Sequence, residues 1–153
     1  MRKNYQEFKE RNTKEFNKFI SKYCFFAYSN KQFQEGLEKV GIPVNTETKD
    51  LKKYIVRLDS VGGYLLKDHE TEYDKICKKL LKVERKYLNN FKNLYSALLY
   101  EMYNHECGYT WNFTDCLEPL GFSKKDLKTN KQLLKAFRKA KQSVIAYEMS
   151  KEE

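Results

Sequence analysis

The chain has 153 residues, with 30 Lys and Arg against 21 Asp and Glu, which gives a formal net charge of +9. Hydrophobic residues make up 41% and aromatic residues 15%, while there are only 6 Gly and 2 Pro. This composition excludes disordered, collagen-like and low-complexity proteins, and the length predicts a single compact domain spanning residues 1–153.

The first quarter of the chain predicts two helices separated by a strand. Aromatic residues recur at helical spacing between Tyr5 and Ile20, which is typical of an amphipathic helix. Residues 24–28 are apolar and aromatic but too few for a helix, so we expect a strand. Ser29-Asn30 supplies an N-cap for a helix that ends near Gly41.

A hairpin is predicted next, after a polar loop at residues 45–50. The apolar segments 54–58 and 64–66 flank residues 59–63, which include Gly62 and Gly63 at a turn. Together with the strand at 24–28, these segments predict a small antiparallel sheet of about three strands in the N-terminal half.

The rest of the chain has the apolar periodicity of helices. A long helix is expected from residue 68 to the break at Asn89-Asn90, and a second at residues 94–107. Short helices follow at 115–120 and 123–128, and Asn130 can cap a long final helix. The predicted class is therefore α+β, mostly helical.

Charge is distributed unevenly along the chain. Between Asn93 and Ser123 there is no Lys or Arg, and this stretch carries four carboxylates among seven aromatic residues. Two interpretations stand side by side: a surface that binds a basic protein, or the buried centre of the fold. The residues that would form the binding surface are Glu101, His105, Glu106, Tyr109, Trp111, Asp115 and Glu118.

The final helix carries a basic stripe that could follow a nucleic-acid backbone, although a solvated helix face is the alternative. Its members are Lys128, Lys131, Lys135, Arg138, Lys139 and Lys141. Only five of the chain's basic residues are Arg, the residue that most often reads bases, so sequence-specific recognition is not expected.

No set of residues predicts catalysis, a metal or a cofactor. Glu101 and His105 share a helix face, but zinc would need further ligands, and Cys107 and Cys116 lack the close pairing typical of zinc sites. A Cys107–His105 nucleophile is disfavoured because residues two apart on a helix do not face each other. We therefore expect a non-enzymatic protein with no cofactor and no metal.

Several stretches in order resemble a family of small uncharacterised proteins from phages, plasmids and genomes of Firmicutes. They are Tyr5–Glu10, Phe25–Gly36, Gly62–Tyr64 and, most specifically, Asn104-His105-Glu106-Cys107-Gly108-Tyr109-Thr110. Cys107 stands where the family more often has an aromatic residue. The resemblance implies an accessory protein of a mobile element and supplies no catalytic residues.

Taken together, these features predict a protein that binds and inhibits a host machine, with a defence nuclease such as a CRISPR effector or its ribonucleoprotein as the expected target. The alternative is a nucleic-acid-binding accessory protein that acts through its lysine-rich surface. No apolar stretch is long enough to span a bilayer, and the first seven residues are too polar for a secretory signal. We expect a location in the cytoplasm of the host bacterial cell and no membrane contact, while the oligomeric state is left open.

Overall fold

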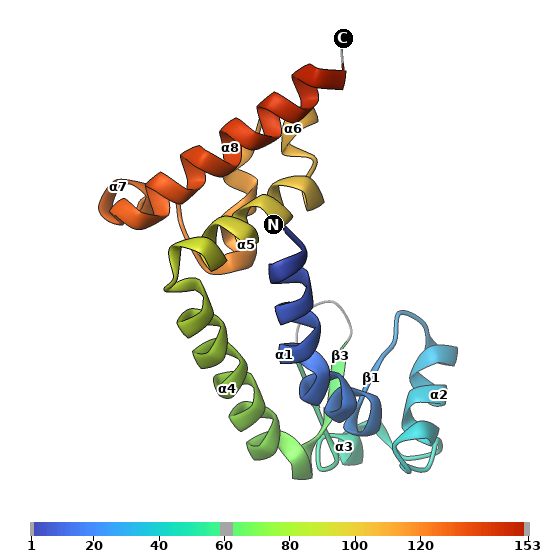
Figure 1. Cartoon of the computed structure of the whole chain (residues 1–153). Helices are drawn as coiled ribbons and strands as arrows, with labels where there is room; N and C mark the ends of the chain where they lie inside the picture. Colours follow the sequence, from blue (N-terminus) through green and yellow to red (C-terminus); the bar gives the residue numbers. More distant parts are fainter. Residues whose placement is uncertain (1, 59–62, 152–153) are drawn as a thin grey trace. The chain divides into compact units, whose positions relative to one another are not determined.

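The computed structural model describes residues 2–58 and 63–151, and it is mostly helical with one small antiparallel sheet in the N-terminal half (Figure 1). The predicted α+β class is thus confirmed. The chain divides into two compact units, one formed by Asn12–Leu81 and the other by Met1–Arg11 with Lys82–Glu153. Two long helices, α1 (Arg2–Tyr23) and α4 (Glu70–Leu88), contribute residues to both units. The single domain expected from the length stays a prediction.

The sheet of the Asn12–Leu81 unit has three strands in the order β1-β3-β2. They are β1 (Cys24–Phe26), β2 (Ile55–Arg57) and β3 (Gly63–Leu66), and β3 pairs antiparallel with both neighbours. Leu65 lies opposite Cys24 on one side and opposite Val56 on the other. The three predicted strands are therefore present, while most of the predicted turn, residues 59–62, lies outside the described residues.

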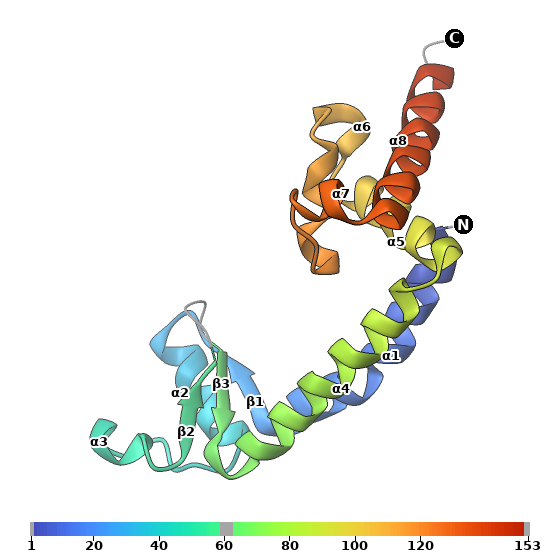
Figure 2. The same ribbon diagram turned by 90° about the vertical axis from the view of Figure 1, so that its left-hand side faces the viewer.

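Strand β1 ends two residues before the predicted position because capping of the next helix begins there. The Tyr28 N–H donates to Oε1 of Gln32 at 2.7 Å, and Ser29 Oγ accepts from the Gln32 N–H. Helix α2 (Asn30–Lys39) follows and lies beside the sheet (Figure 2). Gly36 lets it approach β1, because a Cβ at this position would overlap the ring of Phe25.

The predicted polar loop at 45–50 contains a one-turn helix, α3 (Thr48–Leu51). Leu51 packs against a small core of Phe25, Leu37 and Ile42. The packing of Leu51 therefore stabilises a helical turn in an otherwise polar stretch. The sequence of this stretch has no helical periodicity that would predict the turn. A 3₁₀ turn at Lys67–His69 then leads into α4.

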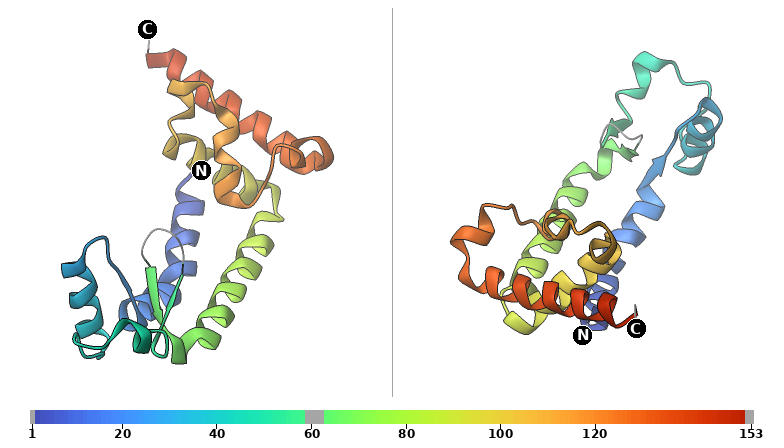
Figure 3. Two further views of the ribbon diagram at one scale, coloured as in Figure 1. Left: turned by 180° about the vertical axis from the view of Figure 1, so that it is seen from behind. Right: turned by 90° about the horizontal axis from the view of Figure 1, so that it is seen from above.

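The other unit is built on α5 (Phe91–Asn104) and α8 (Lys131–Lys151), which pack along each other (Figure 3). Leu98, Met102 and Leu133 are fully buried at their contact, where Ala140 also lies in the core. Asn90 caps α5 by accepting from the Asn93 N–H, so the helix begins three residues before its predicted start. The predicted cap of α8 is confirmed, since Asn130 Oδ1 accepts from the Leu133 N–H.

Short elements connect α5 to α8. They are α6 (Cys107–Thr110), the 3₁₀ turns η2 (Phe113–Cys116) and η3 (Glu118–Leu120), and α7 (Asp126–Thr129). The helix predicted at 115–120 is thus replaced by two 3₁₀ turns. The helix predicted at 123–128 is shortened, because Ser123 donates from its N–H and hydroxyl to the Asp126 carboxylate from outside the helix. Among the described helices, none has the length and apolarity needed to cross a bilayer.

Candidate functional site

Helix α6 is held between two non-glycine residues in the left-handed region. Glu106 precedes it with φ 52° and Trp111 follows it with φ 61°. Side chains other than glycine rarely adopt this conformation, and each instance costs about 1 kcal/mol or more. Gly108 lets α6 approach α8 closely, because a Cβ there would lie 2.7 Å from Glu148 Cγ and 3.0 Å from Val144 Cγ1.

This turn places two large aromatic side chains in solvent. Tyr109 is 85% exposed and Trp111 is 64% exposed. Trp111 meets the ring of Phe113 edge-on at 5.9 Å between centroids, and Phe113 is itself buried in the core. The indole therefore packs against a core residue on one side and faces solvent on the other, which is typical of an aromatic anchor at a protein interface.

Three of the four acidic residues of this region are exposed: Glu106, Asp115 and Glu118. Within the described part of the chain, none of the three takes part in an ion pair, although the protein carries 30 Lys and Arg. We call Glu106, Tyr109, Trp111, Asp115 and Glu118 the acidic–aromatic residues.

Glu101 requires a correction, because the structure removes it from the predicted surface. Its side chain is 1% exposed and lies within the core on α5. Its carboxylate is 3.9 Å from Lys9 Nζ and 3.4 Å from His105 Nε2. Neither carboxylate oxygen accepts a hydrogen bond within the described structure. Glu101 therefore lies in the core beneath His105, which is half-buried and forms the C-cap of α5.

Other titratable groups surround this buried carboxylate. Burial raises the pKa of Glu84, the neighbouring Glu101 raises it further, and Lys9 opposes both effects. Burial also raises the pKa of the Tyr5 hydroxyl far above its usual value, with Glu84 and Glu101 adding to the shift. The ring of Tyr5 packs edge-on against Tyr100, at 5.3 Å between centroids. Burial of Glu84 and Tyr5 therefore disfavours their charged forms.

Replacing Glu84 with Gln is expected to raise the free energy of unfolding at neutral pH. A carboxyl whose pKa is raised in the folded state penalises folding above that pKa, and the penalty vanishes once pH falls below the unfolded value of about 4.3. The gain should therefore be present at about pH 7 and absent near pH 3.5, as measured by urea denaturation. Glu35→Gln, at an exposed position, is the matched control, and lower stability of the Glu84 variant at neutral pH would contradict the assignment.

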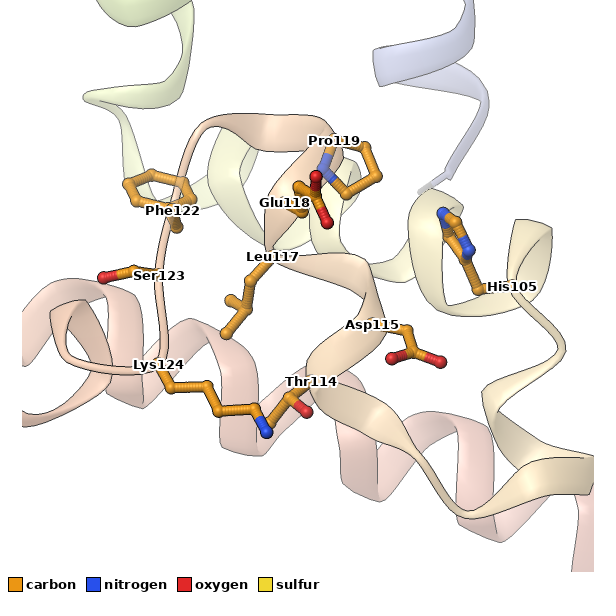
Figure 4. Close-up of a pocket in the computed structure, with 9 residues that line it drawn as sticks. All are labelled: His105, Thr114, Asp115, Leu117, Glu118, Pro119, Phe122, Ser123 and Lys124. Carbon is orange, nitrogen blue, oxygen red and sulfur yellow. The ribbon is translucent and has the colours of Figure 1, made fainter.

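A cavity of about 780 Å³ lies beside His105 (Figure 4). Its lining includes Asp115 and Glu118 from the acidic–aromatic residues, the apolar Leu117 and Phe122, and His105 itself. In the view of Figure 4, His105 and Asp115 lie on one side and Phe122 on the other. The volume falls in the range of about 300–1,000 Å³ that is typical of ligand pockets.

The cysteines near this region are poorly suited to nucleophilic chemistry. Cys107 and Cys116 are completely buried, and burial is the main cause that raises the pKa of Cys107 to about 11 and that of Cys116 to about 12. Both thiols are therefore protonated at neutral pH, whereas the reactive form is the thiolate. Cys107 also donates to the Asn112 carbonyl oxygen at 3.3 Å. Among the described residues, no group of three or more His, Cys, Asp or Glu could hold a metal ion.

Of the six basic residues predicted as a stripe, five lie on α8 and one on α7. Lys131, Lys135 and Arg138 are exposed and follow one face. Lys139 is also exposed, and its Nζ lies 5.7 Å from the centroid of the Phe91 ring, over which Lys135 Nζ lies at 5.6 Å. Lys141 is half-buried, with Nζ 5.2 Å from the centroid of the Phe113 ring. Lys128 is exposed on α7. Four of the six residues, Lys131, Lys135, Arg138 and Lys139, thus share one exposed face of α8, where lysines also cover aromatic rings.

The comparisons with known proteins give a family but no function. A model of a family of unknown function (DUF7659) matches residues 4–143. The chain belongs to this family. The acidic–aromatic residues, the cavity and the six basic residues all lie within the part that matches the DUF7659 model. No curated protein and no solved structure matches the chain.

The sequence indicated the acidic–aromatic region but not how its residues divide between core and surface. It also missed the contact between Lys9 and Glu101, because the two residues lie on different helices, α1 and α5. The pairing of Glu101 with His105 had a signal, since residues four apart share a helix face. The left-handed conformation of Glu106 and Trp111 had no signal in the sequence, because neither residue type favours that conformation.

Proposed function

We propose that the chain is a non-enzymatic accessory protein that binds a basic protein surface through its acidic–aromatic residues. The observation that carries the proposal is the exposure of Tyr109 and Trp111 in a segment that also holds three exposed carboxylates, none of which has an ion-pair partner among the described residues. Tryptophan and tyrosine are the residues that most often dominate binding energy at interfaces. Carboxylates around them would guide association with a partner of opposite charge.

The most basic protein surfaces in a bacterial cell are those that bind nucleic acid, whose backbone carries regularly spaced negative charge. A carboxylate-bearing surface can occupy such a groove and exclude the nucleic acid. We therefore propose inhibition of a nucleic-acid-dependent host enzyme, with a defence nuclease such as a CRISPR effector as the expected target. The family resemblance to mobile-element proteins supports the same target.

The experiment is a DNA-cleavage assay with purified CRISPR effector ribonucleoproteins, in which the wild-type chain is compared with Trp111→Ala. An interface anchor of this kind is worth about 2 kcal/mol or more, so affinity should fall about 30-fold. The melting temperature should stay near the wild-type value, because the Trp111 side chain is 64% exposed. A Glu106→Lys/Glu118→Lys variant should associate more slowly, with the greatest loss at low salt.

The second candidate, direct binding of nucleic acid, is favoured by the exposed row Lys131, Lys135 and Arg138 on α8. Binding assays with nucleic acid separate the two functions. Affinity for random DNA or RNA that falls steeply with salt, and that is lost in Lys131→Ala/Lys135→Ala/Arg138→Ala but kept in Trp111→Ala, would support the second candidate. Cleavage left unaffected by the wild-type chain would contradict the first.

A further inference from the structure

We infer that the cavity beside His105 receives an arginine side chain from an extended segment of the basic partner. This inference rests on the proposed function, because it names the chemistry that the acidic–aromatic residues would recognise. The cavity lies where Asp115 and Glu118, two members of that set, face a common space (Figure 4).

The charge of the lining favours a cation. Neither Asp115 nor Glu118 forms an ion pair within the described residues, so both carboxylates are available to a ligand. Lys124 also lines the cavity, and no ion pair joins it to either carboxylate in the described structure. Lys124 is exposed on a flexible stem, so a ligand cation can take its place near the carboxylates.

A buried group supplies an independent observation behind the lining. Glu101 is 1% exposed and its two oxygens accept no hydrogen bond within the described structure, yet one of them lies 3.4 Å from Nε2 of His105. His105 in turn lines the cavity. Glu101 thus contacts the imidazole ring from the core side of the cavity wall, while its other oxygen lies 3.9 Å from Lys9 Nζ. A buried carboxylate kept without hydrogen bonds carries a desolvation cost that packing alone does not require.

The shape and chemistry of the lining distinguish arginine from other cations. The described residues offer no group of three ligands for a metal ion. Pro119 and Phe122 supply apolar surface for an aliphatic stem, and the lining includes two rings, those of His105 and Phe122. A guanidinium stacks on such rings and binds carboxylates through two parallel hydrogen bonds, whereas an ammonium is a strongly hydrated point charge.

The test uses the full chain labelled with ¹⁵N and three blocked peptides that alternate glycine with arginine, lysine or citrulline, the last being a neutral isostere of arginine. The arginine peptide should shift the amide resonances of Asp115, Glu118 and Phe122, and the citrulline peptide should not. Asp115→Asn/Glu118→Gln should weaken binding of the arginine peptide about tenfold or more. Glu47→Gln/Asp50→Asn makes the same change of charge at a distant part of the sequence and should leave the affinity unchanged.

Three outcomes would overturn the inference. Equal binding of the lysine peptide would remove the preference for a guanidinium, and the absence of binding by the wild-type chain would remove the site. Binding that survives Asp115→Asn/Glu118→Gln but is lost in Trp111→Ala would place the ligand on the exposed aromatic residues instead. That last result would contradict arginine binding in the cavity and leave the proposed function intact. If the arginine peptide binds as expected but the chain does not inhibit a nuclease, only the proposed function is contradicted.

Discussion

Leu98→Ala is expected to lower the free energy of unfolding by about 2–5 kcal/mol, the largest effect of any substitution considered for this chain. Leu98 is fully buried on α5, in the core that α5 shares with α8. Removing its terminal carbons forfeits the free energy of burial and leaves a space that Leu133 and Ala136, both fully buried, can fill only in part.

Urea denaturation followed by circular dichroism measures this effect, with Leu81→Ala as the matched control. Leu81 is 52% exposed, so its truncation should change stability by less than about 1 kcal/mol. The same experiment tests the expectation of a single domain. One transition that moves as a whole would support it, whereas a transition that splits, with the Asn12–Leu81 unit unaffected, would contradict it.

Glu101→Met is expected to raise the free energy of unfolding, by about 1–4 kcal/mol. The Glu101 carboxylate is fully desolvated and receives no hydrogen bond within the described structure, so its burial is poorly compensated. The Lys9 and His105 side chains are 48% and 36% exposed, so water can solvate both once the carboxylate is gone. Methionine has a similar length and fills the same space without charge.

A double-mutant cycle with Lys9 separates this explanation from simple packing. Lys9→Met alone should destabilise the protein, because it withdraws a cation from a buried carboxylate. In the background of Glu101→Met, the same change should have little effect. If Glu101→Met lowers stability instead, the carboxylate contributes to the core and does not serve mainly to position His105. A rise in stability with weaker binding of the arginine peptide would show a charge retained for function at the expense of the fold.

The long helices and the strands of this chain follow from local features of its sequence, whereas the short helix α3 does not. Ser29 and Asn130 mark helix starts because each supplies an oxygen to the N–H groups that a first turn leaves unsatisfied. The apolar segments that form β1, β2 and β3 are short and aromatic or β-branched, which is sufficient to predict strands. These signals act over a few residues, and the sequence displays them directly.

The division of the acidic and aromatic residues between core and surface was decided by tertiary structure. Glu101 and Glu106 are five residues apart and chemically identical, yet one is buried beside Lys9 while the other is exposed at a left-handed turn. Trp111 is large and apolar, yet its side chain is 64% exposed. Helix α6 packs against α8 through Gly108, and Trp111, which follows α6, faces solvent. Such placements depend on contacts between helices distant in sequence, whose free energies outweigh the local preference of any single side chain.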